Sequence, residues 1–445
     1  MKKIFALFMV MVMVSTAIFF LSGKSATGNI IKGEACKDCN VILISFDALR
    51  ADHLGVYGYE KNTSPNIDAF SEDSLVFENC ISQAPWTLPS HVSMLTGEYP
   101  SHHGAMKATS ELGNSTITIA DILHDKGYKT VAFTGGGFTS KKYNYHTFDI
   151  FNDTKTTNNS MEIQNVINWV DSNSKGKFFL FWHTFSTHAP YAPSKQFDVF
   201  SDKNYNGMLN SLNSSALQKI LKESINNLTQ EDIDYMISKY DGGILEADYN
   251  FGELIKELKE KNILDKTIII VVSDHGESFA EREEQKRIGH VILYKEVMHV
   301  PLIVRIPGVP GNKMQGTVEL IDIMPTVLSI LNMQVPDSVD GKSLFSASTA
   351  DFAYSENSYH EERSSLIYKN YHLIHDKNNN TFEFYNLNND PEERNNLFGN
   401  KSEEESLMVR EILRRESVNH SAGKTENAEM DEELVEQLKA LGYAN

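Results

Sequence analysis

Acidic and imidazole side chains follow directly after two of the most apolar stretches of the sequence. Asp47 comes after NVILISF at residues 40–46, and Asp274 and His275 come after TIIIVVS at residues 267–273. Carboxylate oxygens and imidazole nitrogens both bind divalent metal ions. If the two stretches are parallel strands, their carboxyl ends meet at one edge of a sheet and bring these side chains together. The pattern predicts a divalent metal site, and helix caps with a surface histidine are the structural alternative.

A proline-punctuated segment, PWTLPSHVSMLTGEYPSHHG at residues 85–104, carries hydroxyl groups before a predicted helix over 90–96. Thr87 and Ser90 stand near the start of that helix. A hydroxyl there commonly caps the helix. Alternatively, the helix dipole and a nearby metal lower the pKa of the hydroxyl and make it a nucleophile for an anionic substrate. The segment alone favours the cap.

Three histidines also lie beside predicted strand ends. His183 and His188 belong to HTFSTHAPY after the stretch KFFLFWH, and His290 belongs to GHVILY. A single histidine is more often structural than catalytic. Three of them near a predicted metal site indicate groups that hold an anion or protonate a leaving group.

The apolar stretches alternate with helical patterns, and this alternation predicts how the polar residues are positioned. Further buried strands are expected at 129–134 and 177–183, and helices at 118–126, 161–172 and 249–261. Such alternation is typical of a doubly wound α/β sheet, whose ligands bind at the carboxyl ends of the strands. From about residue 336 the alternation stops. Short strands at 352–354, 365–368, 371–375 and 382–386 then predict a small antiparallel sheet, followed by a charged helical tail.

Composition excludes some classes of function. The chain has 445 residues, and its 41 Lys and Arg against 60 Asp and Glu give a net charge of −19. A protein this acidic is a poor candidate for binding the DNA or RNA backbone. Three cysteines are too few for a disulfide scaffold. We expect a local disulfide between Cys36 and Cys39, and a buried free thiol at Cys80.

The N-terminus has the layout of a targeting segment. Lys2 and Lys3 precede an apolar run from Ile4 to Leu21, and small residues follow that run. We predict that residues 1–26 are a signal peptide, with an uncleaved membrane anchor as the alternative. The protein is therefore expected to be exported, either periplasmic or extracellular, with membrane anchoring through this segment left open. Residues 38–335 are then the predicted catalytic domain, and residues 336–445 the small-sheet subdomain and the tail.

Several motifs, taken together and in this order, resemble the sulfatase family of the alkaline phosphatase superfamily. They are VILISFDALRADHLGVYGY, TLPSHVSMLTGEYPSHHG, HTFSTHAPY, VVSDHGE, GHVILYKEVMHVPLIVRIPG and EFYNLNNDPEERNNL, and they cover about residues 40–398. The resemblance implies a large mixed sheet flanked by helices, followed by a four-stranded sheet.

The resemblance also implies roles for individual residues. Asp47 matches the family's first metal ligand, and Asp274 with His275 matches the second pair. His188 matches the substrate-holding histidine of an H-x-P motif, and His290 stands where the family has a lysine. Thr87 stands at the position of the nucleophile.

Four positions depart from the family pattern. Sulfatases oxidise a Cys or Ser at the nucleophile position to formylglycine, and Thr87 cannot yield that aldehyde because its Cβ carries a methyl group. The motif's arginine is His91, the usual second aspartate is Ala48, and the lysine of the A-G-K-W-H segment is missing near Gly136. A threonine nucleophile resembles instead the branch that forms phosphothreonine intermediates, such as lipoteichoic acid synthases and phosphoethanolamine transferases.

The sequence therefore predicts a sulfatase-family, metal-dependent hydrolase or transferase that acts on phosphate, phosphonate or sulfate esters through Thr87. Its cofactor is expected to be one divalent ion (Mn, Mg, Zn or Ca), with no formylglycine. A small-molecule, glycan or lipid-linked ester is the expected substrate. Two alternatives remain open: a sulfuric ester hydrolase that works without formylglycine, and a sulfatase-like binding protein without catalysis.

Overall fold

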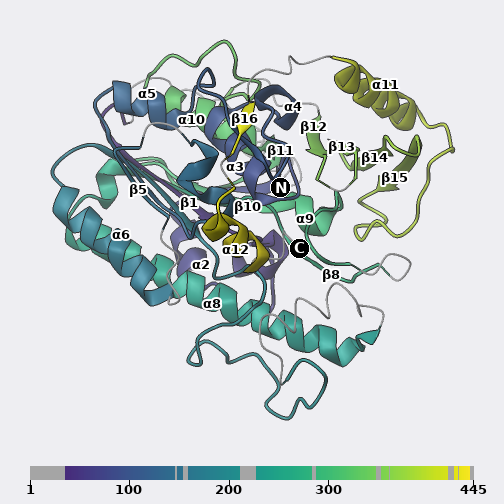
Figure 1. Cartoon of the computed structure of the whole chain (residues 1–445), viewed down its shortest axis with the longest axis horizontal. Coiled ribbons are helices and arrows are strands. Elements are labelled where there is room, and N and C mark those ends of the chain that lie inside the picture. The colour runs from purple at the N-terminus through teal and green to yellow at the C-terminus, as the bar shows by residue number, and fades with distance from the viewer. Residues whose placement is uncertain are drawn as a thin grey trace, which may run out of the picture.

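The structure is a computed structural model. It describes residues 36–145, 148–153, 159–210, 227–282, 287–346, 352–359, 361–418, 425–428 and 430–440. Helices lie on both sides of a large sheet, and a small sheet with its own helix lies at one side of the molecule (Figure 1). This arrangement confirms the predicted fold class, a large mixed α/β sheet with a small antiparallel sheet after it.

The large sheet has the strand order β11-β2-β10-β7-β1-β6-β4-β5. The strands from β7 to β5 in this order are parallel, whereas β10 is antiparallel to both of its neighbours, which makes the sheet mixed. In chain order the strands are β1 (Asn40–Phe46), β2 (Leu75–Ile81), β4 (Lys129–Phe133), β5 (Ile150–Asn152), β6 (Phe178–Thr184), β7 (Thr267–Ser273), β10 (His299–Arg305) and β11 (Asn312–Glu319). Phe46 pairs with both Thr184 and Ser273, so the last residues of β1, β6 and β7 lie side by side.

The central strands are apolar at every position because both faces of the sheet are covered. In β1, Val41 and Leu43 pack into one hydrophobic cluster, and Ile42, Ile44 and Phe46 pack into another. Side chains alternate between the two faces of a strand, so each cluster belongs to one face. The first cluster is covered by α3 (Thr87–Thr96), α5 (Ile119–Asp125) and α10 (Ile323–Ile330), and the second by α2 (Pro65–Ser71), α6 (Asn159–Asn173) and α8 (Gln230–Glu260).

Two predicted helices begin earlier than expected. The helix expected at 249–261 is α8, which starts with a capping box at Thr229 and continues through Gly242 and Gly243. A Cβ at Gly243 would lie 2.3 Å from the carbonyl oxygen of Ser186, so glycine here lets the loop after β6 cross the helix closely. The other is α3, which starts at Thr87 instead of residue 90.

The C-terminal region forms the predicted four-stranded antiparallel sheet. Its strands β12 (Ala353–Asn357), β13 (Arg363–Tyr368), β14 (Tyr371–Asp376) and β15 (Thr381–Asn386) pair in chain order. Met408 and Ile412 of α11 (Glu403–Ser417) pack against this sheet. The chain then returns to the large sheet, where β16 (Thr425–Asn427) pairs with β3 (Ser110–Leu112) and α12 (Glu432–Ala440) buries Leu434 and Leu438. The remaining short elements are α4 (Pro100–His103), α9 (Lys295–Met298), β8 (Ser278–Phe279) and β9 (Ile288–Gly289).

The cysteines are arranged as predicted, with a disulfide between Cys36 and Cys39 and a buried free thiol at Cys80. Over the residues that the structure describes, we find no helix with both the length and the apolar character needed to cross a bilayer. The predicted signal peptide or anchor at residues 1–26 lies outside those residues.

Candidate active site

The Thr87 hydroxyl lies at the N-terminus of α3, against the carboxyl edge of the sheet. Trp86 occupies the N-cap position, and Thr87 is the first helical residue, so its side chain is not the N-cap. Thr87 is buried, and its Oγ1 lies 3.5 Å from Nε2 of His275. The other candidate hydroxyl, Ser90, donates to the carbonyl oxygen of Asp274 and so braces the helix against β7.

Asp47, Asp274 and His275 come together as the sequence predicted, all completely buried. Each carboxylate has one oxygen held by the protein and one oxygen without a partner. Oδ1 of Asp274 accepts from the backbone N–H groups of Ala48 and His275, and Oδ2 of Asp47 faces Nε2 of His183 at 3.1 Å. The other two oxygens, Asp47 Oδ1 and Asp274 Oδ2, are buried without a hydrogen-bond partner.

These unpartnered oxygens surround a single imidazole nitrogen. Nδ1 of His275 donates to the carbonyl oxygen of Gly276, so in the neutral ring Nε2 carries the lone pair. That Nε2 lies 3.6 Å from Oδ1 of Asp47 and 3.3 Å from Oδ2 of Asp274. Ligands of a tetrahedral ion with bonds of about 2.1 Å are about 3.4 Å apart. The donor set, its spacing and its orphaned oxygens therefore fit a divalent metal.

The charges of the site point the same way. Burial, reinforced by the charge of Asp274, raises the pKa of Asp47 to about 7. Burial also lowers the pKa of His275 to about 4, with His290 adding to the effect. A divalent cation would relieve the repulsion between the two carboxylates and would bind the neutral form of the imidazole.

His188 and His290 lie next to this cluster, on the side of His275. The ring of His290 is 4.2 Å from that of His275, and the ring of His188 is 5.3 Å from that of His290. Nδ1 of His188 donates to the carbonyl oxygen of Ala189, so in the neutral ring Nε2 carries the lone pair. The structure therefore places all six predicted site residues within one constellation.

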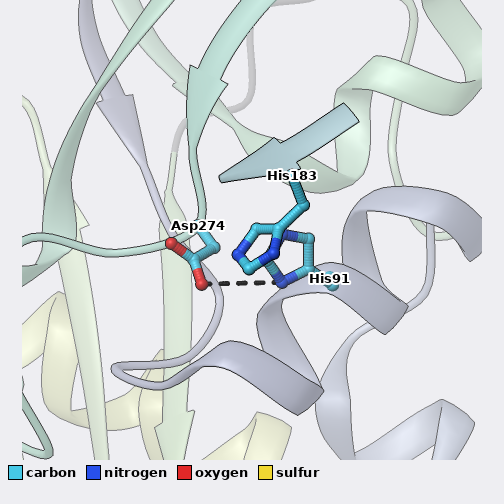
Figure 2. Close-up of side chains that lie close together, drawn as sticks. All are labelled: His91, His183 and Asp274. Carbon is cyan, nitrogen blue, oxygen red and sulfur yellow. Dashed lines mark ion pairs between the residues drawn. The ribbon is translucent and has the colours of Figure 1, made fainter. Parts of the chain in front are cut away.

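Three further residues belong to this constellation. The sequence had singled out His183 as a histidine beside a strand end and His91 as a departure from the family motif, but it gave Glu277 no role. Glu277 is completely buried, its Oε1 lies 3.4 Å from Nδ1 of His290, and burial raises its pKa to about 6. His91 and His183 both lie beside Asp274 (Figure 2), with Nδ1 of His91 at 3.5 Å from Oδ2 of the carboxylate. A signal for Glu277 was its place in the DHGE motif, two residues after His275.

Two of the departures from the family pattern have visible structural consequences. Ala48, which adopts a positive φ of 59°, offers its backbone N–H to Asp274 instead of a side-chain oxygen to a metal. At Gly136 the space is taken by the C-terminal helix, because a Cβ there would lie 2.7 Å from Oε1 of Gln437 in α12. The same oxygen accepts from the backbone N–H of Gly137. A side chain at position 136 would have to displace the end of Gln437, would meet the backbone carbonyl oxygen of Asp153 at 3.0 Å, and would be strained by the φ of +81°.

Comparisons with known proteins agree with this geometry. The sulfatase family model matches residues 39–333, and the model of the N-sulphoglucosamine sulphohydrolase C-terminal region matches residues 285–419. Together with the fold and the relatives described next, these matches define an ester hydrolase of the alkaline phosphatase superfamily. The chain belongs to the sulfatase family.

The relatives include both sulfatases and a phosphonate hydrolase. An arylsulfatase of Clostridium perfringens is 25% identical over 465 residues, covering 87% of this chain and 96% of its own length. An endo-4-O-sulfatase of Bacteroides thetaiotaomicron is 24% identical and covers 70% and 73% of the two chains. The phosphonate monoester hydrolase of Agrobacterium radiobacter superposes with a TM-score of 0.72 at 17% identity, covering 88% of this chain and 100% of its own. A structure solved with D-glucosamine-2-N,6-O-disulfate superposes with a TM-score of 0.73 at 18% identity, covering 87% and 99%.

Proposed function

We propose that this protein cleaves phosphate or phosphonate esters, or transfers the group they carry, through Thr87 and one bound divalent metal. The observation that carries the proposal is the position of the Thr87 hydroxyl, 3.5 Å from the same His275 nitrogen that faces the unpartnered oxygens of Asp47 and Asp274. Nucleophile and metal ligands thus share one buried point at a helix N-terminus, where an anionic substrate is favoured.

Asp47, Asp274, His275 and Thr87 would hold the metal. When bound, the ion lowers the pKa of the hydroxyl and withdraws charge from an ester oxygen. An imidazole ligand and Ala48 in place of a second aspartate suit manganese, zinc or magnesium better than a calcium site built only of oxygens.

The residues of the chain then share the chemistry as follows. The Thr87 hydroxyl first loses its proton to solvent. The ionised Oγ1 then attacks phosphorus in line with the leaving oxygen, and a covalent phosphothreonine forms as the ester bond breaks. His188 and His290 hold the remaining oxygens of the group or give a proton to the leaving oxygen. Water or another alcohol then attacks phosphorus and releases the group from Thr87.

A sulfate ester is the second candidate substrate, because relatives of this chain are named as arylsulfatase and endo-4-O-sulfatase. In that case Thr87 would act as a plain alkoxide, since its methyl-bearing Cβ cannot give formylglycine. The sulfated-sugar substrates of relatives support a glycan as the group that carries the ester. A lipid-linked or small-molecule substrate would present the same ester group to Thr87.

Intact-protein mass spectrometry after mixing and acid quench tests the proposal. Aryl phosphate, aryl phosphonate and aryl sulfate esters are compared on the same enzyme, with Thr87→Ala as the matched control. We expect an adduct of one phosphoryl group on wild type and none on the variant. Sulfate turnover exceeding the others would overturn the phosphoester assignment. Equal background rates for wild type, Thr87→Ala and Asp274→Ala would support the binding protein without catalysis.

We also propose that the protein works outside the cytoplasm, on the strength of the targeting layout of residues 1–26. N-terminal sequencing of the protein recovered from the secreted and membrane fractions of an expressing bacterium distinguishes cleavage from anchoring. The division into a catalytic part at 38–335 and a C-terminal part at 336–445 likewise remains a proposal, which limited proteolysis near residue 336 would test.

A further inference from the structure

His183 contacts a proposed metal ligand without being one of the proposed catalytic groups. It lies near the end of β6, completely buried, with Nε2 at 3.1 Å from Oδ2 of Asp47. On the opposite side of the ring, Nδ1 lies 3.2 Å from the hydroxyl oxygen of Thr139. The imidazole therefore spans the space between the metal ligand and the loop after β4.

The hydrogen-bond network assigns the proton on each nitrogen of His183. A carboxylate that binds a metal carries no proton, so the bond between His183 and Asp47 requires a hydrogen on Nε2. Oγ1 of Thr139 lies 3.2 Å from Nδ1 of His183 and 2.8 Å from the carbonyl oxygen of Gly136, so its hydroxyl can donate to either acceptor. If the hydroxyl turned to Gly136 instead, Nδ1 would donate to Thr139 and Nε2 would still carry its hydrogen.

The same reasoning argues against a second metal held by His91, His183 and Asp274, whose ligand atoms lie within 4.8 Å of one another. Nε2 of His183 carries a hydrogen and has no lone pair to offer. Nδ1 of His91 faces the carbonyl oxygen of Thr87 at 2.9 Å, and a carbonyl only accepts, so this nitrogen is also protonated. Nε2 of His91 in turn accepts from the hydroxyl of Ser45. Two of the three donors in the cluster of Figure 2 are thus occupied by protons.

We propose that His183 is a positioning residue that turns the Asp47 carboxylate toward the metal. By donating to Oδ2, it holds the carboxylate with Oδ1 toward Nε2 of His275, at 3.6 Å. Thr139 fixes the imidazole from behind. The proposal rests on the proposed function, since it takes Asp47 to be a metal ligand.

Two substitutions that differ only in reach test this role. In His183→Gln the amide nitrogen can occupy the place of Nε2 and donate to Asp47. In His183→Asn the shorter side chain brings its amide only to the place of Nδ1, where it meets Thr139. We expect the glutamine variant to bind Mn²⁺ with nearly wild-type affinity and the asparagine variant to bind it about 10–100-fold more weakly, which is the usual effect of losing a partner of a metal ligand.

Calorimetric titration of the chelator-treated full chain with Mn²⁺ measures affinity and stoichiometry without a substrate. The control is His124→Gln at a partly exposed histidine that contacts Asp125 and Asp149. Equal affinity of both His183 variants and wild type overturns the positioning role but leaves the proposed function intact. Loss of binding in both variants, or loss of one of two bound ions, identifies His183 as a ligand and also overturns it. A wild type that binds no Mn²⁺ overturns the proposed function itself, and the positioning role with it.

A third variant covers the case in which the asparagine variant does not fold. Thr139→Val keeps the shape of the loop side chain and removes the hydroxyl behind the ring. We expect it to weaken Mn²⁺ binding less than His183→Asn but measurably, with an unchanged circular dichroism spectrum. If Thr139→Val and His183→Gln both bind Mn²⁺ with wild-type affinity, the Thr139 hydroxyl does not help to fix the His183 imidazole. This outcome would contradict the proposed support of the ring by Asp47 and Thr139.

Discussion

Replacing Asp47 by asparagine removes one charge from the site while nearly preserving its shape. The stability of the metal-free variant therefore measures how strongly the site requires a cation. Asp47 is completely buried and its Oδ1 has no hydrogen-bond partner. Burial, and then the charge of Asp274, raise its pKa to about 7 from the model-compound value of 3.8.

The sign of the effect follows from linkage between protonation and folding. Between pH 3.8 and 7 the folded protein keeps a proton on Asp47 that the unfolded chain has lost, so the free energy of unfolding decreases as pH rises. One pH unit in this range corresponds to about 1.4 kcal/mol. From pH 5 to pH 8 the free energy of unfolding of wild type should therefore decrease by about 3 kcal/mol because of Asp47. The Asp47→Asn variant should not show this decrease.

Urea unfolding in the presence of chelator, at pH values from 5 to 8, measures this difference. Other buried carboxyls titrate in both proteins, so only the difference between the two curves is used. Asp125→Asn, at a side chain that is 84% exposed, serves as the control and should parallel wild type. Adding Mn²⁺ at pH 8 to a hundred times its dissociation constant should stabilise wild type by about 2.7 kcal/mol and leave Asp47→Asn nearly unchanged.

A parallel dependence of stability on pH in wild type and Asp47→Asn would contradict a raised pKa of Asp47. In that case another group, not identified by the geometry, would compensate the negative charge of Asp47 in the metal-free protein. Equal stabilisation of both proteins by Mn²⁺ would show that the ion binds elsewhere.

Three further predictions concern catalysis and the core. Thr87→Ala should reduce kcat by about 10³-fold or more, whereas Thr87→Ser, which keeps the hydroxyl, should retain most of it. If Thr87→Ala and wild type have equal rates in a stopped assay, Thr87 is not the nucleophile. His188→Asn keeps a donor near the carbonyl of Ala189 but removes Nε2, so kcat/KM should fall about 10²–10⁴-fold with unchanged Mn²⁺ affinity. Phe251→Ala, in the buried face of α8, should cost about 3–5 kcal/mol in urea unfolding, and a loss below 1 kcal/mol would contradict the packing described.

Much of the fold and the candidate metal ligands followed from local patterns. β1 and β7 are apolar at every position because they are buried on both faces, so Asp47 and Asp274 stand out as the first polar groups at their carboxyl ends. The four strands of the C-terminal sheet were also predicted, as short runs that follow one another after residue 336. The start of α8 was missed because Gly242 and Gly243 interrupt its helical pattern, and the reason for glycine lies in a loop that is remote in the sequence.

The type of fold followed from the sequence alone, as did the candidate metal ligands at the strand ends and a proposed nucleophile, Thr87, that cannot form formylglycine. Three contacts became known only from the folded chain: His183 with one oxygen of Asp47, Glu277 with His290, and Gln437 with Gly136. The physical reason is that polarity and periodicity along a strand report burial, which is local. Which hydrogen-bond donor contacts which acceptor depends on the packing of segments that are far apart in the chain. A single sequence does not show which distant segments are in contact.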